Sequence, residues 1–589
     1  MTAPDCRVCG AAPADGEFCG RCGARTTTRR GDGPEWLRRS AYAASDGPLL
    51  RPAFTTTIFP MLPRRLLLVF RLAPAAVVAL LIVTAVWRWQ PPLVAVVGLG
   101  LPLLFVAYLY ATDAVARLPR TAWVATVGIG AGLGVVWALG TEAAAAREGG
   151  DALGIPPSLT RILVTDLAVP LSFVLCLFAA AVVVRAWRPV ERESLTGFAV
   201  GALSAFWFTG VGTLTRLSSS FASEADTENT RSALGLVVAA LVQGVALPLT
   251  AAAVAGAFGA SLWFVGPRDG APLPRWAPPS PLAVAVFGVI AFLGLGVVDL
   301  TGPPYPVEVA LYALLAVLAL AVLRMVLHTT LLHEARRERT ALEPCPQCGA
   351  DASGPLFCSR CGVARTAIAR RTTRPALLTT ALSAGTAVLL AGSVALSALL
   401  TPPEPNYVCP PDCGSPPISE PVATNPRFTP DTGEFSVSYP AEGTAYEATL
   451  QDDGVVLELL AGDGGVLRLF GQPAEGRSPR EIAKALIAEH YDDAVFDYEI
   501  PNAMVGYQPG YGEVDDVFPS TSVADDTRAR VLVMVAVKND YALIAAGAGP
   551  YREFTPDFGS GHPSGANFFL ALDMGKYVNS FEWRGDPPR

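Results

Sequence analysis

The sequence predicts a polytopic α-helical membrane protein of about nine spans, with two small cysteine-rich modules and a C-terminal α+β domain. Of the 589 residues, 51% are hydrophobic and only 16% are charged, and the mean hydropathy is +0.39. Residues 402–589 carry 12 Lys and Arg against 29 Asp and Glu, whereas residues 1–401 carry 32 against 23. A hydrophobic, basic part followed by an acidic tail indicates membrane spans with a soluble domain in a different compartment.

Two cysteine-rich modules, residues 1–25 and 343–363, share one pattern of two CxxCG knuckles separated by nine residues. Four thiolates at this spacing close over one tetrahedral Zn²⁺, so we expect each module to be a zinc ribbon. Because cysteine fills all four positions, no position is open to water or substrate, and the zinc is expected to be structural. Iron is the alternative metal, and free or disulfide-bonded cysteines are the alternative to metal binding. The predicted ligands are Cys6, Cys9, Cys19, Cys22, Cys345, Cys348, Cys358 and Cys361.

Both modules are expected in the cytosol, because thiolate ligands need a reducing compartment. Their knuckles carry few basic or aromatic residues, so a docking or self-pairing role is predicted and nucleic-acid binding is not. Two arrangements stay open at this point. The ribbons pack against each other, or each simply anchors a short terminus or loop.

Nine apolar runs are long enough to cross a bilayer, which takes about 20 residues each. An Arg-rich cytosolic linker, residues 26–65, precedes a block of eight spans over residues 66–328, and the ninth span follows the second module. The sixth run could extend to Val265 as a re-entrant or interfacial piece. The predicted spans are 66–88, 92–112, 121–140, 162–185, 195–216, 233–256, 282–300, 307–327 and 377–400.

Loop charge supports this count, because cytosolic loops are enriched in Lys and Arg. With the N-terminus inside, the inner loops are basic and the outer loops acidic, and an odd number of spans places the C-terminal domain outside. The excess of Arg over Lys, with many Ala and Gly, indicates a bacterial source, so we expect a multi-pass protein of the inner (plasma) membrane. The inner loops include Arg117, Arg120, Arg185, Arg188, Arg192, Arg268 and Arg275, and the outer loops include Glu142, Glu148, Glu224, Asp226, Glu228, Asp299 and Glu308.

A stalk with ten prolines, residues 402–430, follows the ninth span. Such a segment is extended and acts as a stiff spacer. It contains Cys409 and Cys413, which we expect to form a small disulfide loop outside the cell. A metal pair or a lipid attachment site is the alternative.

The C-terminal domain, residues 431–585, is predicted to be an antiparallel sheet with two helices on one face, because its strand-like runs alternate apolar and polar residues. Ser478 and Glu481 form a capping box that opens the first helix, which ends near residue 491. The second helix is expected over about 565–576. The acidic pairs Asp515-Asp516 and Asp525-Asp526 are expected in a solvated loop, with weak cation binding as the alternative. The predicted strands are 434–439, 445–450, 455–460, 466–470, 495–500, 530–537, 541–546 and 577–583.

Polar residues within the predicted spans are few. Asp166 and Gln243 are the main candidates for an intramembrane function, since ionisable or polar groups in lipid are costly. An interfacial or helix-packing role is the alternative for Asp166, and an interhelical hydrogen bond for Gln243. The four histidines lie outside the predicted spans, at His328, His333, His490 and His562.

The membrane block carries three loose motifs, which are Pro102–Asp113 followed by Pro119, Ala168–Pro170, and Glu193–Phe206. Over roughly residues 66–265 they resemble the PrsW-type intramembrane proteases. Generic helices rich in Gly and Ala are the alternative explanation.

The resemblance implies a Glu-Glu pair shortly after Pro170, a Glu in the next helix and a His in the helix after that. This sequence has neither a carboxylate nor an imidazole at those places, so the resemblance implies an inactive relative, which lacks groups to hold a metal or activate water. The places read Leu171-Ser-Phe173-Val174-Leu175, Phe208-Thr-Gly210-Val and Gly244-Val245-Ala-Leu-Pro248-Leu249.

The C-terminal domain opens with a strand at Gly433–Pro440 and closes with Val578–Trp583. These two stretches resemble PsbP-like α/β domains. That resemblance implies a non-enzymatic domain that binds partners, and it transfers no catalytic residue.

Together these features predict a non-catalytic integral membrane scaffold or signal-coupling protein. The zinc ribbons are its cytosolic interaction modules, and the outer domain meets a partner in the cell envelope. The alternatives are a PrsW-like peptidase of altered chemistry, which needs an intramembrane ionisable cluster, and a small-molecule transporter, which needs a polar path through the bundle.

Overall fold

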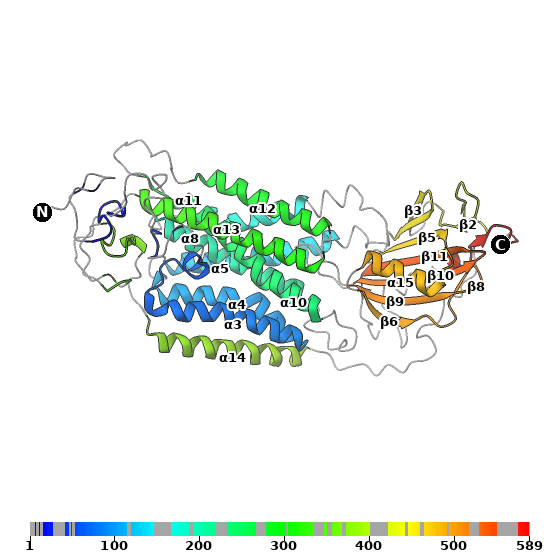
Figure 1. Cartoon of the computed structure of the whole chain (residues 1–589), viewed down its shortest axis with the longest axis horizontal. Helices are drawn as coiled ribbons and strands as arrows, with labels where there is room; N and C mark the ends of the chain where they lie inside the picture. The colour runs from blue at the N-terminus through cyan, green and yellow to red at the C-terminus, as the bar shows by residue number, and fades with distance from the viewer. Residues whose placement is uncertain are drawn as a thin grey trace. The chain divides into compact units, whose positions relative to one another are not determined.

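The structure is a computed structural model of the whole chain (Figure 1). Nearly all residues of its membrane-length helices and both cysteine modules belong to one compact unit, the helical unit, and its C-terminal strands belong with helix α15 (Pro479–His490) to a second, the sheet unit. The residues described are 6, 11, 16–26, 42–45, 49, 53–114, 119–145, 167–187, 193–217, 233–266, 279–301, 304–334, 345, 347–349, 356–367, 373–400, 422–441, 446–459, 465–491, 494–517, 529–550 and 575–587.

Within the described residues, nine helices are long and apolar enough to cross a membrane, which confirms the predicted number. The sixth is a single helical stretch of 30 residues that continues to Trp263, and it contains one π-helical turn, η4. The eighth ends at His333 rather than near residue 327, so His328 lies within it. The helices are α3 (Leu67–Val86) after η1 (Arg64–Leu66), α4 (Gln90–Ala111), α5 (Arg120–Ala145), α7 (Val169–Ala186), α8 (Ser194–Arg216), α10 (Ala233–Leu241) with η4 (Val242–Ala246) and α11 (Leu247–Trp263), α12 (Pro281–Thr301), α13 (Tyr305–His333) and α14 (Pro375–Leu400).

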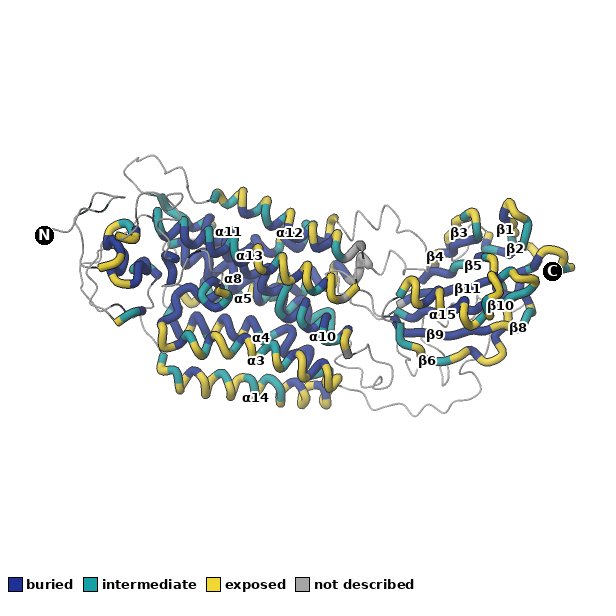
Figure 2. The backbone as a smooth tube through the Cα atoms, in the orientation of Figure 1, coloured by how far each residue is buried: buried dark blue, intermediate teal, exposed yellow. Residues whose placement is uncertain are grey.

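Helix α8 lies at the centre of the bundle, and nearly all of its residues are buried. Glycines permit this packing. A Cβ added at Gly197 would lie 2.1 Å from the Gly259 carbonyl oxygen on α11, and one at Gly210 would lie 2.1 Å from the Gly98 carbonyl oxygen on α4. Small residues let helix backbones approach closely where apolar burial gives little driving force. Helix α14 is the opposite case, because most of its residues are exposed (Figure 2).

A short segment before the first span is packed into the helical unit. Helix α2 (Phe54–Ile58) and the following residues 59–62 are mostly buried. The Phe59 ring lies 5.1 Å from that of Phe70 on α3 and 5.0 Å from that of Tyr108 on α4. This segment falls in the range predicted as an Arg-rich linker, and its burial was not predicted from the sequence.

The sheet unit is built on a seven-stranded antiparallel sheet in the order β3-β4-β5-β11-β10-β9-β6. Helix α15 (Pro479–His490) covers one face, and a three-stranded sheet, β1-β2-β12, packs on the other. Both faces are apolar, so the central strands are buried on both sides. The strands are β1 (Arg427–Phe428), β2 (Phe435–Ser438), β3 (Tyr446–Gln451), β4 (Gly454–Leu459), β5 (Val466–Pro473), β6 (Val495–Glu499), β7 (Met504–Val505), β8 (Gln508–Pro509), β9 (Tyr511–Val517), β10 (Ala529–Lys538), β11 (Tyr541–Pro550) and β12 (Glu582–Trp583).

The capping box is confirmed. Ser478 accepts a hydrogen bond from the Glu481 backbone N–H, while the Glu481 side chain accepts one from the Ser478 backbone N–H. The last predicted strand, residues 577–583, is wrong in part, because residues 575–578 form a helical turn and only Glu582–Trp583 pair as β12. Of the second predicted helix, 565–576, all but its last two residues lie outside the described residues.

The acidic loop predicted around Asp515 and Asp516 is wrong. Both residues belong to β9, all seven residues of which are buried. The strand pairs with β10 on one side and β6 on the other. Asp525 and Asp526 lie outside the described residues.

Candidate metal centres

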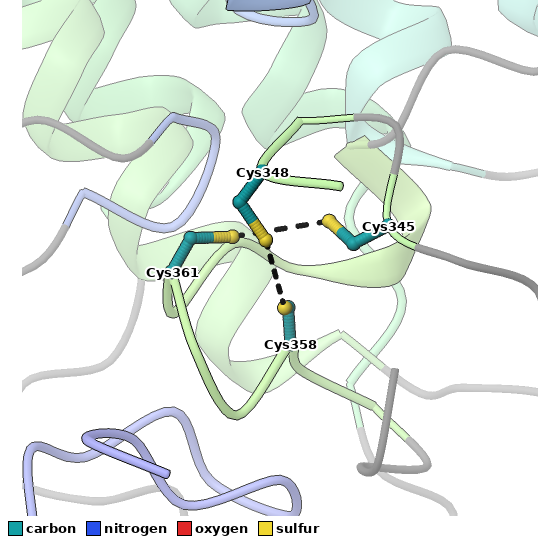
Figure 3. Close-up of side chains that lie close together, drawn as sticks. All are labelled: Cys345, Cys348, Cys358 and Cys361. Carbon is teal, nitrogen blue, oxygen red and sulfur yellow. Dashed lines mark hydrogen bonds between the residues drawn. The ribbon is translucent and has the colours of Figure 1, made fainter. Parts of the chain in front are cut away.

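The second cysteine cluster brings four thiols together (Figure 3). The Sγ atoms of Cys345 and Cys361 are 3.9 Å apart, and those of Cys348 and Cys358 are 3.7 Å apart. All four Sγ atoms lie within 4.8 Å of one another. A disulfide would bring two sulfurs to about 2.05 Å, so these cysteines are reduced thiols.

Each knuckle of this cluster is a tight turn closed by glycine. The Gly349 N–H donates to the Cys345 carbonyl oxygen at 2.7 Å, and the Gly362 N–H donates to the Cys358 carbonyl oxygen at 2.9 Å. Both glycines have positive φ, +73° and +74°, a region that other residues adopt at a cost. The glycine after each CxxC therefore turns the chain so that both sulfurs point to one centre.

The geometry fits a tetrahedral metal ion. With Zn–S bonds of about 2.3 Å, the sulfurs of a tetrahedral site are about 3.8 Å apart, and the two Sγ–Sγ distances given above bracket this value. Four cysteines leave no position open for a substrate, so the cluster suits a structural metal.

The first cluster repeats this arrangement as far as it is described. Cys6, Cys19 and Cys22 lie within reach of one ion, and the Sγ atoms of Cys6 and Cys22 are 3.7 Å apart. The Gly23 N–H donates to the Cys19 carbonyl oxygen at 2.8 Å, with a φ of +72°. The fourth predicted ligand, Cys9, lies outside the described residues. Among the residues that the structure describes, these two clusters are the groups close enough to share an ion.

The two cysteine modules pack against each other through equivalent atoms. The Phe18 N–H donates to the Ser359 carbonyl oxygen at 2.8 Å, and the Phe357 N–H donates to the Gly20 carbonyl oxygen at 2.9 Å. Phe18 and Gly20 hold the same positions in the first module that Phe357 and Ser359 hold in the second. The interface is therefore reciprocal, as at the twofold axis of a symmetric dimer.

Ala43 connects the end of the second module to the helices. The Ala43 carbonyl oxygen accepts from the N–H of Ala364, the residue that follows the module, at 2.8 Å. The Ala43 N–H donates to Nδ1 of His328 on α13 at 3.2 Å. His328 is fully buried, so these two hydrogen bonds connect the end of the module to the interior of the bundle.

One turn earlier on α13, Arg324 holds the segment that follows Ala43. Its Nε donates to the Leu49 carbonyl oxygen at 2.9 Å, and its Nη1 donates to Thr57 Oγ1 at 3.0 Å. Its guanidinium lies 4.0 Å from the ring centroid of Tyr42. This cluster was not predicted from the sequence. The available signals were an Arg in an otherwise apolar run and the apolar stretch 53–62 within the linker.

The end of α13 also contacts the start of α8. Oε1 of Glu334 accepts from the Ser194 backbone N–H at 2.6 Å and from its hydroxyl at 3.1 Å. A carboxylate at this position satisfies a free N–H of the first turn and interacts favourably with the helix dipole. Glu334 thus holds the start of the central helix against the end of α13.

The other predicted sites have different outcomes. Gln243 lies buried on the π-helical turn η4. Asp166, Cys409 and Cys413 lie outside the described residues, so the intramembrane acid and the external disulfide stay predictions.

Two of the stretches that lack the expected carboxylates carry packed aromatic rings. The rings of Phe173 on α7 and Phe208 on α8 are 4.9 Å apart. Phe292 on α12 lies 4.7 Å from Phe173, and Trp137 on α5 lies 5.0 Å from it. These four rings form an apolar cluster among four helices.

The sheet unit contains buried carboxylates. Asp516 accepts from Nε of Arg530 at 2.9 Å, and Arg530 also pairs with Asp497. Asp515 is only 4% exposed, and its Oδ2 has no hydrogen-bond partner among the described residues. Burial, and then the charge of Glu513, raise the pKa of Asp515 to about 7.

No model of a known protein family matches the chain. No curated protein matches it either. The resemblances to PrsW-type proteases and PsbP-like domains therefore rest on the motifs quoted above.

Proposed function

We propose that the protein is a non-catalytic membrane scaffold that couples a pair of cytosolic zinc ribbons to its helical bundle. The observation that carries this proposal is the bonded path from the second ribbon to α13. Ala43 contacts the ribbon through its carbonyl oxygen and His328 through its N–H. A change in the ribbon pair is thereby transmitted to the interior of the bundle.

The chemistry of the cysteine clusters supports a binding role. Four thiolates around one ion leave no open coordination position, which is the property of structural zinc sites. Such ribbons serve as rigid surfaces, so we propose that they contact a cytosolic protein. The C-terminal sheet unit, as a PsbP-like domain, meets a partner in the envelope.

The pairing of the modules also supports the proposed topology. Eight of the nine candidate spans lie between the two modules in sequence. An even number of crossings returns the chain to the side from which it started, so two modules in contact fit eight spans. The ninth span then places the C-terminal domain on the opposite side, outside a bacterial plasma membrane.

The aromatic cluster around Phe173 and Phe208 bears on the alternative of an intramembrane peptidase. If the PrsW resemblance reflects kinship, two of the catalytic places carry packed phenyl rings. Such rings supply helix packing and have no group that binds a metal or activates water. We therefore propose that this block is a pseudoprotease that has kept the helices.

A topology map combined with metal analysis tests the proposal. Single cysteines are introduced at Thr449 in the sheet unit and at Gly149 between the third and fourth spans, and intact cells are treated with an impermeant maleimide. Labelling of both, and about two zinc ions per purified chain, are expected. Arg65→Cys is the control, labelled only after permeabilisation. A sheet unit that is protected in intact cells, or a chain without zinc, contradicts the proposal.

A further inference from the structure

The largest side chain of each cysteine module is buried by the other module. A Cβ added at Gly362 would lie 2.8 Å from Cδ1 of Phe18, so the Phe18 ring rests on the second module's knuckle. A Cβ added at Gly23 would lie 2.9 Å from Cδ1 of Phe357, so that ring rests on the first module's knuckle. Phe18 is 8% exposed and Phe357 is fully buried. Each ring therefore packs on the glycine turn of the opposite module.

The surfaces that receive these rings are formed by the metal knuckles themselves. Gly23 directly follows the ligand Cys22, and Gly362 directly follows the ligand Cys361. The residues that donate the reciprocal backbone hydrogen bonds, Phe18 and Phe357, directly precede ligands of their own cluster. Hence the interface consists of the same backbone that each metal ion fixes.

We infer that the two clusters bind zinc as one cooperative unit, in which an ion at one site raises the affinity of the other through the paired phenylalanines. This inference rests on the proposed zinc binding. A metal-free CxxCG turn is free to leave its folded shape, and it then no longer covers the phenylalanine of the other module. Coupling of this kind is reciprocal, so each site strengthens the other by the same factor.

The second module is also connected to the bundle. Ala364, the residue that follows it, donates a hydrogen bond to Ala43, which contacts His328 on α13. Because the coupling is reciprocal, loss of either ion is expected to weaken binding at the other site by the same factor.

Three glycines provide a matched test. All three have a left-handed backbone conformation, but their neighbours differ. Gly23, Gly362 and Gly349 have φ values of +72°, +74° and +73°. An added methyl group meets a phenylalanine ring at Gly23 and Gly362, and meets nothing within 4 Å at Gly349. Alanine costs similar backbone strain at all three positions, so Gly349→Ala is the control for Gly362→Ala and Gly23→Ala.

The experiment titrates the purified full-length protein, in detergent or nanodiscs, with a competing zinc chelator and measures the zinc retained per chain. The native protein is expected to release two ions in one steep transition, and Gly349→Ala to keep that single transition at a lower midpoint. Gly362→Ala and Phe18→Ala are expected to separate the release into two steps. In Cys19→Ser, the remaining ion is expected to bind more weakly by about tenfold or more, because exposing a buried phenylalanine changes a binding constant by at least that factor.

The outcomes separate this inference from the proposed function. Two ions released independently by the native protein, or identical curves for Gly362→Ala and Gly349→Ala, overturn the coupling and leave the zinc ribbons in place. A native chain that holds no zinc overturns both. Full retention of the first ion in Cys358→Ser also overturns the coupling, and that variant does not alter the phenylalanine contacts directly.

Discussion

The cysteine modules and the sheet unit are held together by different means. The sheet unit has an apolar cluster on each face of its central strands, where Val533 and Val535 face α15 while Met534 faces the small sheet. Each module has one large buried phenylalanine, and that ring packs on the other module. The sheet unit thus contains its own core, whereas the large ring of each module packs on another part of the chain.

Removal of the proposed metal is expected to have the largest effect, because it should unfold the cysteine modules and leave the sheet unit folded. Structural zinc contributes about 10–16 kcal/mol of apparent binding free energy, which a dozen residues cannot replace. After chelation of the full-length protein, we expect peptides from residues 16–26 and 356–367 to lose their protection from hydrogen exchange. Peptides from β10 and β11 should keep theirs. If elemental analysis shows that zinc is lost and the modules still stay protected from hydrogen exchange, the modules do not depend on the metal and the contrast with the sheet unit is wrong.

A cavity in the sheet core should have the reverse effect. Leu543 on β11 is fully buried, and truncation of a buried leucine costs about 2–5 kcal/mol. Leu543→Ala is expected to lower the stability of the sheet unit by about 3 kcal/mol, measured by hydrogen exchange in β10, without changing the zinc content. Thr449→Ala, on an exposed position of β3, is the control. A fall in zinc content would show that the two regions are not independent.

The buried carboxylate Asp515 makes the sheet unit sensitive to pH. Its pKa in the folded state is about 7, against an ordinary value of 3.8 for an aspartate. The folded protein therefore binds the proton more tightly than the unfolded chain does. Stability from this group is therefore present below pH 4 and is lost as the pH rises from 4 to 7. The charged groups that act on it are Glu513, Asp516, Asp497 and Lys484.

Asp515→Asn should remove this dependence. One pKa unit corresponds to about 1.4 kcal/mol. Because the amide must still be buried, we expect the substitution to recover about half of the energy that corresponds to the pKa shift. The free energy of unfolding should rise by about 2 kcal/mol at pH 8 and change little at pH 4. Denaturation of the sheet unit at pH 4 and at pH 8 measures this change in the free energy of unfolding. An equal effect at pH 4 and pH 8 would assign the change to packing instead of charge.

The N-cap of α15 should give the smallest effect. Ser478→Ala removes the hydrogen bond to the Glu481 N–H, and such caps contribute about 1 kcal/mol. We expect faster hydrogen exchange in the first turn of α15 and no change of hydrogen exchange in the cysteine modules. Ser478→Asp, which keeps a capping oxygen, should restore the protection. If it does not, the helix start is held by packing of Ile482 rather than by its cap.

Sequence patterns predicted those elements whose signal is local. The nine apolar runs, both cysteine patterns and the capping box at Ser478 each depend on residues close together in the chain. The β9 strand was missed because it reads Tyr-Gly-Glu-Val-Asp-Asp-Val, and such acidic residues are depleted in strands. In the structure Arg530 from the next strand neutralises Asp516, and this tertiary contact overrides the local preference.

The contacts that define the candidate site were the least predictable. Ala43 has no motif, and its importance comes from two backbone hydrogen bonds to residues about 300 positions away. The burial of Phe59 and its neighbours likewise depends on α3 and α4 being assembled first. Packing of the two cysteine modules against each other was one of two arrangements left open. Equal cysteine spacing in two segments does not predict whether the segments contact each other.

The contact between Phe18 and Gly362 has a consequence for the order of synthesis. Cys19 and Cys358 are 339 residues apart, and ribosomes add about 5–20 residues per second. The first module therefore leaves the ribosome about 20–70 s before its counterpart exists, and the eight candidate spans between them are made in that interval. Under the proposed function, zinc that binds early is held by an unpaired knuckle until the second module has been made.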